Sequence, residues 1–201
     1  IIGDLMKSIN NNVENQIIID RSKFITKLFK LSTEEEAKNI IGKLKLQYKD
    51  STHICYAYIV GNIKRFNDDG EPNGTAGIPI LNVLENNNLD YILAVVIRYF
   101  GGIKLGAGGL VRAYSNSISE CLKLTEIKDL TKGIKLEIIF NYNNIEQINY
   151  LLKEIEITKK VFDNQITYEF NISNEKLMKI EENLNTLIIA KKEKEQLLIT
   201  L

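Results

Sequence analysis

Two glycine-rich loops on either side of an apolar stretch constrain the fold more than any other part of this sequence. The first loop is acidic and runs from Asp68 to Gly77, and the second runs from Arg98 to Gly109 without an acidic residue. Most of the 12 glycines of the chain lie between Gly70 and Gly109. Because glycine permits positive φ and close approach of backbones, we expect both loops to close a tight tertiary contact or to bind a ligand.

Regular elements are expected around these loops. Between them, residues 91–100 are almost continuously apolar, which predicts a strand buried on both faces. After the second loop, apolar residues recur at helical spacing, so we expect a helix with one buried stripe. This stripe consists of Leu110, Ala113, Tyr114, Ser117, Ile118, Cys121 and Leu122.

Upstream of the loops, the sequence predicts strands and another helix. Residues 16–31 predict one or two strands, and residues 54–60 predict a buried strand. A capping-box pattern at 32–36 opens an amphipathic helix predicted over 34–49. Residues 78–84 are apolar enough for a short helix or strand.

The second part of the chain has a different pattern. The periodicity loosens at residues 129–133, and later segments follow in the order βαββαβ, the ferredoxin-like signature. We therefore predict an α+β protein with an α/β domain over residues 1–130 and a ferredoxin-like domain over 131–201. Residues 191–195 alternate Lys with Glu and predict a solvated segment before the last strand.

Composition excludes several classes of protein. Among 201 residues, 26 Lys and Arg balance 26 Asp and Glu, so any contact with nucleic acid must depend on a local patch. No apolar run reaches the roughly 18 residues that span a bilayer, and the start has no signal-peptide pattern. Cys55 and Cys121 lie in apolar patterns, which favours reduced buried thiols and a cytoplasmic protein. Met6 is a candidate natural start.

Both glycine loops also carry a family resemblance. The run DDGEPNGTAGIPILNVL at 68–84 and the run VVIRYFGGIKLGAGGLVRAYS at 95–115 closely resemble the YigZ/IMPACT family. The segments RSKFI at 21–25 and THICYAY at 52–58 resemble its upstream landmarks. A second domain follows and matches by pattern only, so the resemblance spans nearly the whole chain.

This resemblance implies a fold and a class of function. It implies a first domain of the ribosomal-protein/GHMP-kinase type and a second, ferredoxin-like domain, two folds that also occur in tandem in elongation factor G. Eukaryotic members of the family resemble regulators of translation under amino-acid stress. The resemblance therefore implies a translation-linked role.

The basic loop predicts a nucleic-acid or anion-binding site. It leads into a helix N-terminus, where unpaired N–H groups and the helix dipole favour phosphate. The residues expected to take part are Arg98, Gly101, Gly102, Lys104, Gly106, Gly108, Gly109 and Arg112. Ala107 breaks the Walker pattern and Val111 the dinucleotide fingerprint, so neither nucleotide template is matched. A purely structural tight loop is the alternative.

The acidic loop is expected to support this site. Its candidate residues are Asp68, Asp69, Glu71 and Thr75. Such a group can hold a metal or act as general acid and base. We favour a structural role, in which the carboxylates pair with Arg98 and Arg112.

We predict no metal, no cofactor and no catalytic residue. His53 and Cys55 on one strand supply at most half of a zinc site, so His53 is expected to be an ordinary polar residue at a strand end. Phe66 and Tyr99 stand beside charged residues and are the better candidates for an aromatic surface that suits single-stranded RNA.

The leading hypothesis is a non-enzymatic, translation-linked regulatory protein that contacts RNA, the ribosome or a translation factor, and no membrane. One alternative is a hydrolase or a phosphoryl-handling enzyme with its site between the acidic and basic loops. Another is a protein-interaction module, marked by an exposed apolar patch on the ferredoxin-like sheet.

Overall fold

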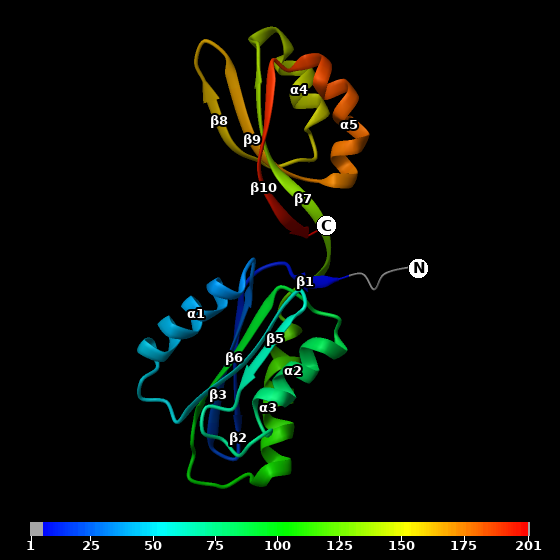
Figure 1. Cartoon of the computed structure of the whole chain (residues 1–201). Coiled ribbons are helices and arrows are strands. Elements are labelled where there is room, and N and C mark those ends of the chain that lie inside the picture. Colours follow the sequence, from blue (N-terminus) through cyan, green and yellow to red (C-terminus); the bar gives the residue numbers. More distant parts are fainter. Residues whose placement is uncertain (1–5, 201) are drawn as a thin grey trace. The chain divides into compact units, whose positions relative to one another are not determined.

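The chain folds into two compact units, residues 1–129 and 130–201, which are described separately. A computed structural model describes residues 6–200, and Figure 1 shows its two antiparallel sheets and its helices. The mixed α/β class is confirmed, whereas the assignment of the units to the two named folds stays a prediction. No helix within residues 6–200 is long and apolar enough to cross a membrane.

The first unit is built on a five-stranded antiparallel sheet with the order β2-β3-β6-β4-β5. Its strands are β2 (Val13–Ile19), β3 (Ser22–Lys30), β6 (Ile92–Tyr99), β4 (His53–Val60) and β5 (Ile63–Asn67). A short strand, β1 (Lys7–Ile9), pairs with the first residues of β7 (Ile127–Phe140). The sequence prediction missed β1 and β5.

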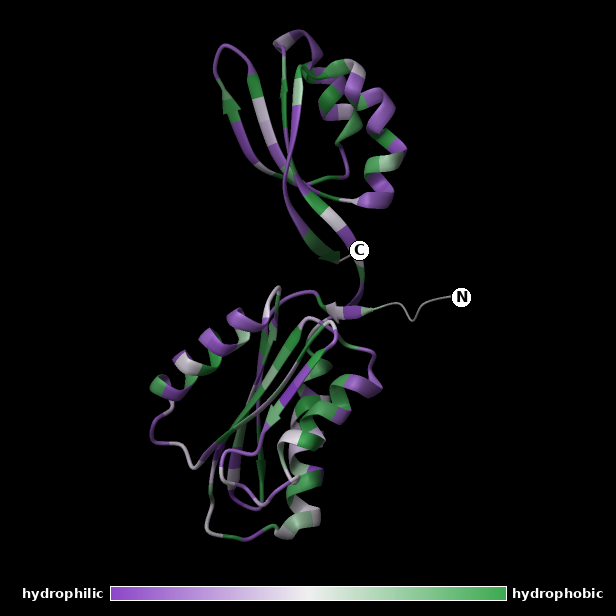
Figure 2. Cartoon of the chain, in the orientation of Figure 1, coloured by the Kyte–Doolittle hydropathy of each residue, from purple (hydrophilic) through white to green (hydrophobic). Residues whose placement is uncertain are grey.

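Helices cover both faces of this sheet. Helix α1 (Glu34–Gln47) packs its buried residues on one face, and α2 (Gly77–Asn86) and α3 (Gly106–Leu122) pack on the other. The central strand β6 contributes to both cores, because alternate side chains along a strand point to opposite faces. Residues 92–98 are all buried, as predicted for this segment, and β6 is almost continuously apolar in Figure 2.

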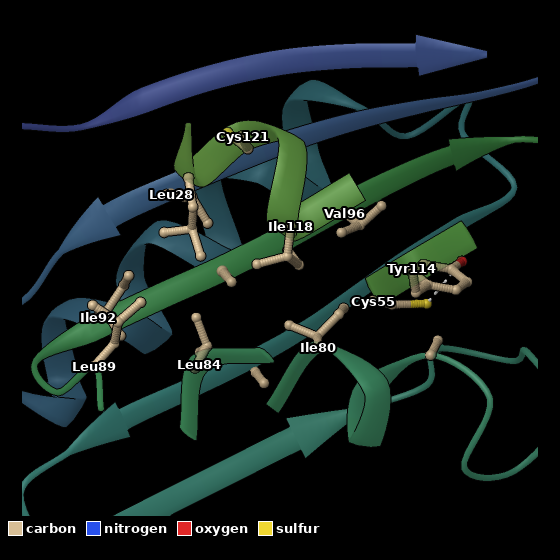
Figure 3. Close-up of a cluster of buried hydrophobic side chains, with 14 of the residues drawn as sticks. Leu28, Cys55, Ile80, Leu84, Leu89, Ile92, Val96, Tyr114, Ile118 and Cys121 are labelled. Atoms are coloured by element: carbon tan, nitrogen blue, oxygen red, sulfur yellow. Dashed lines mark hydrogen bonds between the residues drawn. The ribbon is translucent and has the colours of Figure 1, made fainter. Parts of the chain in front are cut away.

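The predicted helix features are confirmed. The buried residues of α3 are the seven of the predicted stripe, and several of them appear in the core of Figure 3. At α1, the Thr33 hydroxyl accepts from the Glu36 backbone N–H at 3.2 Å, and the Glu36 carboxylate accepts from the Ser32 N–H at 2.8 Å. The N-cap is Thr33, so the chain closes a capping box whose return bond reaches Ser32, one residue before the N-cap.

The second unit follows the predicted order βαββαβ. After β7 come a short 3₁₀ turn, α4 (Ile145–Leu151), β8 (Ile157–Phe162), β9 (Ile166–Ser173), α5 (Asn174–Leu187) and β10 (Ala190–Thr200). The sheet order is β10-β7-β9-β8, with every pair antiparallel. Buried residues of α4 and α5 share one core with the sheet.

Residues 191–195 are exposed, as predicted for a solvated segment, but they belong to β10, so the last strand begins earlier than expected. The strand forms here because its backbone pairs with β7, and its charges find partners across the sheet. The Lys194 ammonium lies 2.5 Å from a Glu137 carboxylate oxygen and 3.1 Å from one of Glu169. Cross-strand ion pairs make a charged sequence compatible with a strand.

Candidate functional site: the pocket between the two glycine loops

A pocket of about 420 Å³ opens in the first unit where the two glycine loops meet. Its walls come from the start of β4, the acidic loop, the end of β6, the basic loop and the first turn of α3. They are formed by Thr52, His53, Glu71, Pro72, Arg98, Phe100, Lys104, Leu105, Gly106, Ala107 and Leu110. Its size falls in the range of small-molecule sites, about 300–1,000 Å³.

A buried ion pair forms the floor of this site. Arg98 Nη1 donates to Glu71 Oε1 at 2.6 Å, and the two side chains are 5% and 3% exposed. Arg98 Nη2 donates to the Ser22 hydroxyl at 3.3 Å, whereas Nε has no hydrogen-bond partner among residues 6–200. The guanidinium carbon lies about 5.5 Å from the ring centroids of Phe24 and Phe100. The charge of Arg98 is therefore paired inside the fold.

Glu71 also receives a hydrogen bond from the core. The Tyr114 hydroxyl donates to Glu71 Oε1 at 2.8 Å, and the Cys55 thiol, 3.3 Å from that hydroxyl, donates to the Asp68 carbonyl oxygen at 3.0 Å. Figure 3 shows Cys55 and Tyr114 side by side. Burial raises the pKa of the Cys55 thiol to about 12 and also raises the pKa of the Tyr114 phenol. Both groups are therefore protonated at neutral pH, and Cys55 is a poor nucleophile.

His53 begins β4, as expected of a polar residue at a strand end, and lies beside the ion pair. Its Nδ1 is 2.8 Å from the Asp69 carbonyl oxygen, which can only accept, so we assign the ring proton to Nδ1. Its Nε2 lies 3.8 Å from Glu71 Oε2, and the side chain is 20% exposed. His53 thus brings a ring nitrogen to the pocket wall.

The aspartates of the acidic loop are used by the fold itself. Asp68 accepts from the backbone N–H groups of Gly74, Ala76 and Gly77, at 2.9, 3.0 and 2.8 Å, and so caps α2. Asp69 accepts from the Ile54 N–H at 2.7 Å and pairs with Lys45. Two adjacent carboxylates thus point to different elements.

We expect Asp68→Ala to lower the free energy of unfolding by about 2 kcal/mol, because three backbone donors lose a charged acceptor. Urea denaturation followed by circular dichroism measures this loss. Asp163→Ala, an exposed position in the β8–β9 turn, is the control and should stay within about 0.5 kcal/mol. Equal stability of the two variants would contradict the capping role.

The basic loop presents an uncapped helix end. No side chain of residues 6–200 is seen to cap the N-terminus of α3, and its first turn has no acidic residue. Gly102 and Gly106 have φ of +86° and +69°, a conformation that L side chains rarely adopt. Lys104 is exposed at the pocket rim, and Phe100 and Ile103 are 46% and 41% exposed. This end of α3 is open to an anion.

The structure brings only part of the predicted site together. Arg98, Glu71, Lys104 and Gly106 meet at the pocket, whereas the buried Thr75 hydroxyl donates to the Pro72 carbonyl. The remaining predicted residues do not line the pocket. Gly101 and Gly102 lie in the basic loop before Lys104, Gly108 and Gly109 lie inside α3, and Arg112 is exposed on the second turn of that helix.

Sequence reasoning missed three residues of the site: Ser22, Phe100 and Tyr114. The apolar stripe identified Tyr114 as buried but gave no sign of its bond to Glu71. Ser22 lies in RSKFI, and its hydroxyl also accepts from the Gly101 N–H at 3.2 Å. Of the two predicted surface aromatics, Phe66 is 44% exposed and Tyr99 is half-buried. Residues 6–200 contain no group of three His, Cys, Asp or Glu side chains that could hold a metal ion.

The family model and the curated relatives of this chain point to one family. The family model described as the Impact N-terminal domain matches residues 20–122. The "IMPACT family member YvyE" of Bacillus subtilis (strain 168) is 46% identical over 74% of this chain and 73% of its own. The "IMPACT family member YigZ" of Escherichia coli (strain K12) is 35% identical over 69% and 70%. A crystal structure of a hypothetical protein is 28% identical, with a TM-score of 0.65, and covers 92% of this chain and 93% of its own.

Proposed function

This chain belongs to the IMPACT family, and we propose that it is a translation-linked regulatory protein that acts by binding RNA rather than by catalysis. The link to translation comes from the family resemblance of the two glycine loops. A cytoplasmic location is part of the proposal. The RNA contact is argued from the surface around the basic loop.

The observation that carries the RNA proposal is the surface of residues 100–112. Lys104 and Arg112 are exposed beside the uncapped end of α3, and no acidic residue occurs in this segment. Cationic side chains and a helix N-terminus attract phosphates, and the exposed Phe100 ring offers a surface on which a base can stack. These are the components of a single-strand RNA contact.

The buried network supports binding over catalysis. Glu71 is paired with Arg98, the aspartates hold backbone N–H groups, and the thiol of Cys55 is protonated. Groups committed in this way to the fold are poor candidates for proton transfer or nucleophilic attack.

Reversing the charges of the basic loop should weaken RNA binding. We expect Lys104→Glu with Arg112→Glu to lower the affinity for single-stranded RNA by about tenfold or more. Losing two phosphate contacts should also make the plot of log K against log salt shallower by about 1.4. Fluorescence anisotropy with labelled oligonucleotides at several salt concentrations measures both quantities.

The matched control reverses two lysines on α1 and just after it. Lys43 and Lys49 are exposed, and α1 packs on the opposite face of the sheet from α3, so Lys43→Glu with Lys49→Glu changes the net charge equally elsewhere. An equal loss of affinity in both double variants would mean that net charge alone drives binding. Failure of the unmodified protein to bind RNA at low salt would contradict the RNA contact, and a translation factor would then be the partner to test.

A further inference from the structure

We propose that the pocket between the glycine loops is a phosphomonoester site that takes the terminal phosphate of a nucleotide, either free or at the 5′ end of an RNA strand. This inference deepens the proposed RNA contact and rests on the same face of the first unit. The argument depends on the helix end, a buried donor without a partner, the charges at the pocket and one aromatic ring.

The first turn of α3 forms one wall of the pocket. Gly106 and Ala107 line it, and α3 has 17 residues, long enough to develop a dipole. The first turn holds no carboxylate, and within the described part of the chain no side-chain cap competes for its N–H groups. A phosphate in the pocket would accept hydrogen bonds from these groups.

Arg98 gives an independent sign of a ligand. Its Nε is the only buried side-chain nitrogen or oxygen without a hydrogen-bond partner among the described residues 6–200. Arg98 lines the pocket, and its side chain is 95% buried, so water does not reach this donor freely. Buried donors are almost always satisfied. A small shift of the Arg98 side chain toward the pocket would bring Nε against a ligand oxygen, which would supply the acceptor that it lacks.

The charges at the pocket favour an anion. Glu71 is the acidic residue in the wall, and its charge is offset by Arg98 and by the hydrogen bond from Tyr114. Among the described residues, Lys104 then stands at the rim without an ion-pair partner. A phosphomonoester fits better than an internal RNA phosphate, because it carries more charge and needs an exit for only one substituent.

The apolar part of the pocket suits a base or a sugar. Phe100, Pro72, Leu105 and Leu110 line it, and Phe100 keeps 46% of its surface exposed. Aromatic rings of this kind stack with nucleobases of any sequence. The pocket thus pairs an anion-binding end with an apolar wall, as a nucleotide requires.

The test compares adenosine monophosphate with adenosine by isothermal titration calorimetry. We expect the monophosphate to bind at least about tenfold more tightly than adenosine, and inorganic phosphate to compete with it. Ala107→Asp should abolish this binding, because it places a carboxylate in the first turn while favouring the helix itself. Asn116→Asp, which adds the same charge at an exposed position of α3 outside the pocket, is the matched control and should bind within about threefold of the unmodified protein.

RNA oligonucleotides with a 5′ phosphate or a 5′ hydroxyl separate the two sources of the ligand. Tighter binding of the phosphorylated strand supports an RNA end, and binding of the monophosphate alone supports a free nucleotide. Equal binding of both strands, together with no binding of the monophosphate, would show that the pocket is not a phosphomonoester site. The proposed RNA contact would remain. Unchanged binding of the monophosphate by Ala107→Asp also overturns it.

Discussion

Replacing Glu71 by glutamine is expected to lower the free energy of unfolding of the first unit by about 3 to 5 kcal/mol. The substitution keeps the size of the side chain but leaves the Arg98 guanidinium, 5% exposed, without its counter-charge. A buried charge without a partner is far more costly than a neutral polar group. Urea denaturation followed by circular dichroism at several probe wavelengths measures the change and tests for two-state unfolding.

Two further variants show whether the ion pair is the cause. Glu85→Gln removes an exposed pair with Lys64, whose partners are 51% and 37% exposed, and should cost at most about 1 kcal/mol. Adding Arg98→Met to Glu71→Gln removes the stranded charge and should recover part of the lost stability. A loss below about 1 kcal/mol for Glu71→Gln alone would show that the buried pair does not hold the loops together.

Gly101→Ala is expected to destabilise the first unit by about 3 kcal/mol. A β-carbon at Gly101 would lie 2.1 to 2.4 Å from the backbone of Arg21 and Ser22, where no flexible side chain can move aside. The basic loop would have to shift away from the β2–β3 turn and lose the bond between the Gly101 N–H and Ser22. Thermal and urea denaturation measure this loss.

Gly42→Ala is the control for this prediction. Gly42 lies in α1, and a β-carbon there meets nothing within 4 Å. Alanine should stabilise the helix by about 0.5 to 1 kcal/mol, because glycine loses more conformational freedom on folding. If both alanine variants proved neutral, the close approach at Gly101 would not be what fixes the basic loop.

Local patterns predicted the parts of the fold that depend on local physics. The α3 stripe, the doubly buried β6 and the capping box at Thr33 follow from periodicity and hydrogen-bonding groups near in sequence. The edge strand β5 was missed because its sequence IKRFN is mostly polar and exposed and has no apolar face to mark it. It forms a strand because its backbone pairs with β4.

The site was only partly predictable, because its contacts join distant residues. A pairing between the acidic and basic loops was expected, yet the sequence did not show that Glu71 alone would meet Arg98 while the aspartates turn to α2 and β4. Nor did it show that Arg98 would be buried. These choices depend on the register between β4 and β6, which places His53 opposite Arg98.

The position of β6 in the sheet has a consequence for synthesis on the ribosome. Strands β3 and β4 are separated in the sheet by β6, which follows both in the sequence and ends at Tyr99. In a nascent chain that stops before β6, β3 and β4 lack the strand that lies between them in the sheet. Long-range pairing of this kind forms slowly. The first unit therefore completes its sheet only once β6 has been synthesised, and until then its apolar strands remain exposed to aggregation or to chaperones.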